Sequence, residues 1–174
     1  MDNLKILQVV GYKNSGKTTL IESFVKMLSE DGKDVAVIKH HGHNNGLQQP
    51  DSNTDSMKFF HAGASLSIAV DNETIQLHKK RGDMPLSKII AWVNILDPDL
   101  LFIEGFKQED YEKIVIVKEW REWEELKGLK NIVCVLTHGE ATIDFPRVFC
   151  INDEEKIWGW LNEWIGGDVE NETF

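Results

Sequence analysis

Short apolar runs alternate along this chain with segments in which apolar residues recur every three or four positions. The short runs predict buried strands, and the spaced segments predict amphipathic helices. The predicted buried strands are residues 4–10, 35–38, 100–103, 113–117, 132–136 and 148–151. Because strands that alternate with helices pair in parallel, this order predicts an α/β fold: a three-layer sandwich with a mainly parallel sheet.

Polar residues mark the starts of the predicted helices. Asp55 or Ser56 is expected to cap a short helix after the second strand, and Ser87 a longer one. Asn152 is followed three residues later by Glu155, which predicts a capping box for the last helix.

Two apolar runs lie close enough together to pair with each other. Residues 66–70 and 74–77 are separated only by Asp-Asn-Glu. This spacing predicts a β-hairpin. We expect it to form an antiparallel edge of the otherwise parallel sheet.

The length of 174 residues predicts a single domain over residues 1–165. Residues 166–174 are polar and acidic, so they are expected to form a disordered tail.

Residues 11–18 read Gly-Tyr-Lys-Asn-Ser-Gly-Lys-Thr and fit the phosphate-binding pattern G-x-x-x-x-G-K-[ST]. The motif follows the first predicted strand and opens an amphipathic helix, which is the context that it requires. The alternative is a glycine-rich turn that only precedes a helix. The agreement of strand, helix and all fixed motif positions favours phosphate binding.

Each residue type in this loop has a chemical reason. Gly11 and Gly16 let backbone N–H groups approach phosphate oxygens that Cβ atoms would obstruct. Lys17 is expected to place its ammonium at the β- and γ-phosphates, and the Thr18 hydroxyl to ligate Mg²⁺. The helix that starts near Lys17 adds its own N–H groups and its positive end.

A phosphate loop also needs an acid that controls the metal ion and its water. Glu104 directly follows the apolar run 100–103, at the carboxyl end of a predicted buried strand, where ligands collect in α/β sheets. The alternative is a surface carboxylate at a strand end. Asp55 is the second acidic candidate, and for it both metal-site proximity and plain helix capping stay open.

Basic and imidazole side chains crowd the segment after the second strand: Lys39, His40, His41 and His43. Contact with phosphate or a partner, a zinc site and a solvated segment are three open explanations. Zinc is the less favoured of these because no cysteine completes a ligand set.

The charge balance excludes one class of partner. The chain has 19 Lys and Arg against 29 Asp and Glu, a net charge of −10, which repels polyanions and excludes a general nucleic-acid-binding role. Its start has no basic segment before an apolar run, and no stretch is as long as a membrane span. We expect a soluble, cytoplasmic protein that binds no membrane.

Cysteine and tryptophan usage suggests core packing. Cys134 and Cys150 both lie in apolar strands and are expected to be core residues rather than disulfide partners. Most of the six tryptophans are also expected to fill the core. Trp160, at the edge of the last helix's apolar face, is a candidate for a self-association interface.

Four segments together resemble the MobB family of molybdopterin-guanine dinucleotide biosynthesis. They are the phosphate loop with Thr19 and Leu20, residues 38–43 (Ile-Lys-His-His-Gly-His), Asp55-Ser56 with residues 62–64 (Ala-Gly-Ala), and residues 102–107 (Phe-Ile-Glu-Gly-Phe-Lys). They occur in this order from the first strand to Lys107. The last three are much more selective than the phosphate loop alone.

The resemblance implies a P-loop NTPase fold and a homodimeric GTP-binding adaptor with weak GTPase activity. It implies as partner a MobA-type guanylyltransferase, which attaches GMP to molybdopterin, with the molybdopterin cofactor itself as a further candidate ligand. Carried onto this chain, Glu104 and Asp55 take the catalytic positions, and Thr18 and Glu104 hold Mg²⁺. The residues expected to hold GTP are Gly11, Asn14, Ser15, Gly16, Lys17, Thr18, Thr19, Lys39 and His40.

Two other functions stay open. One is a P-loop kinase or ATP-dependent ligase that acts on a small metabolite, although three arginines are few for a lid that clamps a transferring phosphate. The other is a metallochaperone GTPase that binds metal through the histidines of residues 40–43. Residue types do not decide between GTP and ATP, because residues 137–140 (Thr-His-Gly-Glu) follow a strand as a base-reading loop would, yet lack the Asn-Lys-x-Asp signature.

Overall fold

The computed structural model describes residues 4–42, 47, 53–139 and 142–167. They divide into two units: a main unit, Met1–Gly42 with Val93–Phe174, and a hairpin unit, His43–Trp92. The assignment of residues 1–165 to a single domain stays a prediction. The expected tail lies almost wholly outside the described residues.

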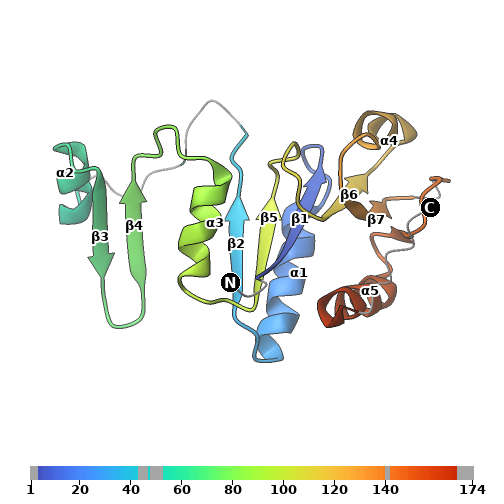
Figure 1. Ribbon diagram of the computed structural model, residues 1–174, viewed down its shortest axis with the longest axis horizontal. Coiled ribbons are helices and arrows are strands. Elements are labelled where there is room, and N and C mark those ends of the chain that lie inside the picture. The colour runs from blue at the N-terminus through green and yellow to red at the C-terminus, as the bar shows by residue number, and fades with distance from the viewer. Residues whose placement is uncertain (1–3, 43–46, 48–52, 140–141, 168–174) are drawn as a thin grey trace. The chain divides into compact units, whose positions relative to one another are not determined.

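The main unit is built on a parallel sheet of six strands in the order β2-β5-β1-β6-β7-β8 (Figure 1). All the strand pairs in it are parallel, which confirms the α/β prediction. The strands are β1 Lys5–Gly11, β2 Val35–Lys39, β5 Leu100–Glu104, β6 Lys113–Val117, β7 Ile132–Thr137 and β8 Val148–Cys150.

Helices cover both faces of this sheet. Alternate strand residues point to opposite sides, so a strand that is apolar throughout needs a cover on each face. On one face, α1 (Lys17–Glu30) and α5 (Glu154–Gly166) pack Phe24 and Leu161 against Leu7 of β1. On the other face, α4 (Trp120–Leu126) packs Trp123 against Val10. Every residue of β5 and β6 is buried, as central parallel strands require. The predicted three-layer sandwich is confirmed.

Several helix starts differ by one or two residues from the predictions. The last helix is capped by Asp153, whose carboxylate accepts the Lys156 N–H, rather than by Asn152. The helix α2 (Asp55–His61) has Thr54 at its N-cap, in extended conformation, so that Asp55 is already helical. Helix α3 (Leu86–Asn94) likewise contains Ser87. Neighbouring polar residues compete for the cap, and sequence alone does not rank them.

The hairpin unit contains α2 and two antiparallel strands, β3 (Leu66–Val70) and β4 (Ile75–Lys79). The predicted hairpin is therefore confirmed, but its predicted place at the edge of the main sheet is wrong, since β3 and β4 form a separate two-stranded sheet. One face of this small sheet packs on α2 instead, where Ser67 donates a hydrogen bond to the Ser56 carbonyl (2.8 Å).

Trp160 and Cys150 do not lie where their apolar sequence patterns predicted. Trp160 is buried in the core beside Leu161, so the prediction that it lies on an interface is wrong. Cys134 is buried as predicted, whereas Cys150, at the end of β8, is exposed. Among the described residues, no helix combines the length and the apolar character needed to cross a membrane.

Candidate functional site

The phosphate loop connects β1 to α1 at the carboxyl ends of the strands. Gly11 lies against β6: a Cβ there would be 2.6 Å from the Ile116 carbonyl oxygen and 2.7 Å from the Ser15 hydroxyl oxygen. Gly16 has a φ of 93° and occupies the N-cap of α1, and Asn14 is also left-handed, with a φ of 59°. The loop backbone therefore has room for glycine alone where it passes Ile116.

The first turn of α1 is open to an anion. No side chain caps this helix, and its first turn contains no acidic residue. The N–H groups at the start of a helix have no partner within the helix, and they lie at the positive end of its dipole. Lys17, Thr18 and Thr19, all predicted to hold phosphate, form this turn.

The Lys17 ammonium folds back over the loop. It donates hydrogen bonds to the carbonyl oxygens of Gly11 (3.1 Å) and Tyr12 (2.6 Å). Burial lowers the pKa of Lys17, Glu104 acts in the opposite direction, and Lys39 lowers the pKa further. This partly desolvated cation, close to backbone groups of the loop, is suited to a phosphate group.

Thr18, Glu104 and Lys39 meet beside the loop. The Thr18 hydroxyl donates to Glu104 Oε2 (3.0 Å), and the Lys39 ammonium lies 2.9 Å from the Thr18 hydroxyl oxygen and 3.0 Å from the same carboxylate oxygen. Glu104 is only 8% exposed, so the alternative of a plain surface carboxylate is not supported.

These oxygens fit a magnesium ion. Mg²⁺ binds oxygen ligands at about 2.1 Å in octahedral geometry, so neighbouring ligands are about 3.0 Å apart. The Thr18 and Glu104 oxygens, which are hydrogen-bonded at 3.0 Å, have a separation compatible with this geometry. Waters and phosphate oxygens usually supply the remaining ligands of Mg²⁺ in such sites.

Gln8 supports the site from within the sheet, although the sequence analysis did not select it. Its side chain is fully buried and donates to the carbonyl oxygens of Gly105 (2.6 Å) and Phe106 (2.7 Å). His40 stacks on Phe106 with ring centroids 4.3 Å apart. Gln8 and His40 therefore hold the turn that follows Glu104. The only signal for Gln8 in the sequence is a polar residue within an apolar strand.

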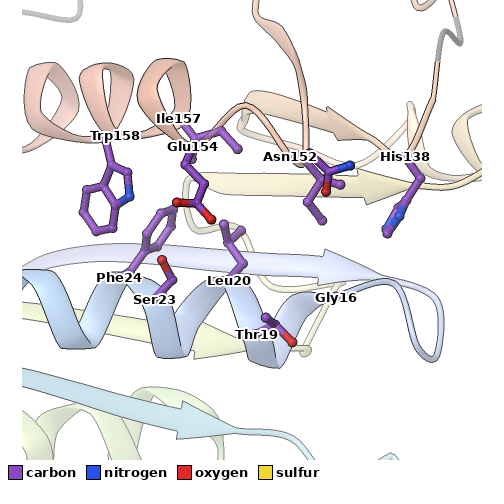
Figure 2. A pocket seen from close by; sticks show the side chains of 11 residues that line it. Gly16, Thr19, Leu20, Ser23, Phe24, His138, Asn152, Glu154, Ile157 and Trp158 are labelled. Carbon is purple, nitrogen blue, oxygen red and sulfur yellow. The ribbon is translucent and has the colours of Figure 1, made fainter.

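A pocket of about 370 Å³ lies beside the phosphate loop, between α1 and α5. Figure 2 shows Leu20 and Phe24 of α1 pointing toward Ile157 and Trp158 of α5, and the rings of Phe24 and Trp158 are in edge-to-face contact. His138 and Asn152 line it as well, and a ring nitrogen of His138 lies 2.8 Å from the Ser15 carbonyl oxygen. The pocket has the apolar walls and polar groups of a site for a flat ligand attached to the phosphates.

The positions of the other predicted site residues relative to this arrangement stay predictions. Asp55 belongs to the hairpin unit, where it pairs with Lys58 (2.9 Å), so its place near a γ-phosphate stays a prediction. Within the described ranges, no three His, Cys, Asp or Glu side chains come together to hold a metal ion. His43 lies outside those ranges, as does Glu140 of the predicted base-reading segment.

The strand order, the glycine-lined loop and the acid on the neighbouring strand define a P-loop NTPase fold. The family model described as "MobB: Molybdopterin guanine dinucleotide synthesis protein B" matches residues 6–138. The chain belongs to this family.

Individual relatives agree with this assignment. A probable molybdopterin-guanine dinucleotide biosynthesis adapter protein of Bacillus subtilis is 37% identical over 131 residues, which cover 75% of each chain. The adapter protein of Haemophilus influenzae is 31% identical over 94% of this chain and 91% of its own. The crystal structure of Bacillus subtilis MobB superimposes with a TM-score of 0.78 at 32% identity, covering 92% of this chain and 98% of that one.

The close approach at Gly11 can be tested against a second glycine. We expect Gly11→Ala to lower the free energy of unfolding by about 1–3 kcal/mol, because its Cβ would overlap the Ile116 carbonyl and Ser15. Gly159→Ala, within α5 and with open space around its Cβ position, should instead raise it by about 0.5–1 kcal/mol. Urea denaturation of both variants gives these differences, and equal stability of Gly11→Ala and the wild type would contradict the steric explanation.

Proposed function

We propose that this chain is a GTP-binding adapter with weak GTPase activity, which assists the attachment of GMP to molybdopterin in the synthesis of the guanine dinucleotide form of the molybdenum cofactor. The observation that carries this proposal is the meeting of Lys17, Thr18 and Glu104 at the phosphate loop. The names of the relatives supply the pathway.

The residues at the loop suggest how a triphosphate would be held. Lys17 would exchange its contacts with the Gly11 and Tyr12 carbonyls for phosphate oxygens. The N–H groups of the first turn of α1 would donate to the same phosphates. Thr18 and Glu104 would hold Mg²⁺, which when bound offsets the negative charge of the phosphates.

The pocket between α1 and α5 would receive the base and ribose. It adjoins Gly16 and Thr19, so a nucleotide with its phosphates at the loop extends directly into it. Ile151 and Trp158 are half-buried and provide apolar surface for a flat base, whereas the Phe24 ring is fully buried against Trp158. Asn152 and His138 offer hydrogen bonds to its edge.

Slow turnover favours the adapter over a kinase or ligase. With Mg²⁺ bound, Glu104 would be a metal ligand together with Thr18, so its carboxylate would be poorly available to activate water. The chain has only three arginines, which are few for a lid that clamps a transferring phosphate, and an arginine at that phosphate is the usual source of fast phosphoryl transfer.

Nucleotide binding is tested by calorimetry with GTP and ATP, each with Mg²⁺. We expect GTP to bind more tightly than ATP. Lys17→Ala should weaken GTP binding at least ~10-fold, about 1.4 kcal/mol, because its ammonium is removed from the loop. Lys26→Ala, a surface lysine further along the same helix, is the control. Equal GTP affinity in folded Lys17→Ala would remove the phosphate-loop assignment, and preferential ATP binding would favour the kinase or ligase.

The adapter role is tested in a reconstituted synthesis. A MobA-type guanylyltransferase is supplied with molybdopterin and limiting GTP, and the guanine dinucleotide product is measured with and without this protein. We expect the wild type to raise the yield and Lys17→Ala to give less, since it delivers less nucleotide. A yield that is indifferent to the wild-type protein would contradict the adapter role.

Self-association is the second part of the proposed assembly, and the hairpin unit supports it. In the antiparallel register, Leu66, Ile68 and Val70 of β3 share one face with Ile75 and Leu77 of β4. These side chains are between 42% and 70% exposed, and α2 covers only the opposite face. A two-stranded sheet whose apolar face is not covered by its own helix α2 is marginal by itself, so a second copy of this face is the proposed cover.

Ile68→Glu tests this interface, because a carboxylate at the centre of the apolar face cannot be buried in a dimer without a partner. We expect wild-type dimers and Ile68→Glu monomers in analytical ultracentrifugation. Ile95→Glu places the same change on an exposed isoleucine outside the hairpin unit and should remain dimeric. A wild type that is monomeric at all concentrations would exclude the dimer.

A further inference from the structure

Lys39 occupies an unusual position for a lysine at a strand end. It is the last residue of β2, and in the parallel register it lies directly beside Glu104 of β5. The hydrogen bond from the His40 N–H to the Glu104 carbonyl (2.8 Å) extends this pairing beyond the strand. The backbone therefore delivers the Lys39 side chain to the predicted metal ligands.

The ammonium completes a triangle with those ligands. The sides are 2.9 Å from Lys39 Nζ to the Thr18 hydroxyl oxygen, 3.0 Å from Nζ to Glu104 Oε2, and 3.0 Å between the two oxygens. The Thr18 hydroxyl donates its proton to Glu104 and accepts one from Lys39. Both oxygens that fit Mg²⁺ are thus already engaged by one internal cation.

A divalent ion and this ammonium cannot use the two oxygens together. Any point about 2.1 Å from both oxygens lies no more than about 4 Å from Lys39 Nζ in its present position. Two cations at such a separation repel strongly beside a largely buried carboxylate. Metal binding at Thr18 and Glu104 therefore requires the Lys39 side chain to move.

The surroundings allow this movement. The Lys39 side chain is 51% exposed, so its ammonium can leave without breaking core packing. A groove of about 380 Å³ continues from the triangle along α1, past Ile21 and Val25. A terminal phosphate held by Lys17 would offer the displaced ammonium a new anionic partner, as phosphates do for lysines at such loops.

We propose that Lys39 is an internal cation that competes with Mg²⁺ for Thr18 and Glu104, so that the metal site accepts a divalent ion only when Lys39 is displaced. The proposal rests on the proposed nucleotide site and adds a specific role for Lys39 in it. Lys39 acts as a gate for metal rather than as a catalytic residue. Free Mg²⁺ then binds weakly, and metal and nucleotide bind together.

Manganese is a suitable probe, because Mn²⁺ accepts the same oxygen ligands and its free concentration is read by electron paramagnetic resonance. We expect Mn²⁺ to bind the nucleotide-free wild type weakly and nucleotide-free Lys39→Met at least ~10-fold more tightly. Lys39→Arg keeps the positive charge and should remain weak. In the double variant Lys39→Met, Glu104→Gln the gain should disappear, which would locate the bound ion at Glu104.

Lys26→Met is the matched control. Lys26 lines the same groove but lies two turns further along α1, about 12 Å from Thr18 along the helix axis. Its replacement removes the same charge without opening the triangle, so Mn²⁺ affinity should change less than about twofold. A similar gain in Lys26→Met and Lys39→Met would show a general charge effect and would overturn the proposal.

The nucleotide-free titration separates this proposal from the proposed function. Unchanged Mn²⁺ affinity in folded Lys39→Met would overturn the competition, whatever the nucleotide result. If instead Lys39→Met binds Mn²⁺ tightly while the wild type binds neither GTP nor ATP, the competition stands and the nucleotide function fails. With GTP present, the rise in Mn²⁺ affinity that GTP causes should be smaller in Lys39→Met than in the wild type.

Discussion

The parallel pairing of β1 with its two neighbours is the constraint on which the site depends. Val9 lies beside Glu104 of β5, and Gly11 lies beside Ile116 of β6. Because all three strands end at the same edge, the loop that follows β1 leaves the sheet next to the acid that ends β5. Every residue of β5 and β6 is buried, so these strands are held at the centre of the sheet with covering layers on both faces.

Local electrostatics at this edge oppose the charge of the whole chain. The net charge of the whole chain is −10. At this edge, however, Lys39 pairs with Glu104, and both groups act on the pKa of Lys17, which Glu104 raises and Lys39 lowers. A chain that repels polyanions in general can therefore attract a small anion at this edge alone. The proposed competition between Lys39 and Mg²⁺ follows from the same crowding of charge.

Most of the fold could be predicted from the sequence, because each strand and helix has its own periodic pattern. The phosphate loop could also be predicted from residues 11–18, because its glycines and the helix that follows it are local features of the sequence. The hairpin was predicted as a hairpin but placed in the wrong sheet. Which sheet a pair of strands joins depends on contacts with distant elements such as α2, and alternation within the pair does not reveal these contacts.

What the sequence by itself determined is therefore the chemistry of single segments: the phosphate loop, the acid at the end of an apolar strand and the family resemblance. Tertiary structure alone decided that Gln8 holds the turn after Glu104, that His138 reaches the Ser15 carbonyl and that Lys39 joins Thr18 and Glu104. These contacts link residues from 21 to 123 positions apart. Only strand register and helix packing bring such residues within hydrogen-bond distance, and neither leaves a mark in a local stretch of sequence.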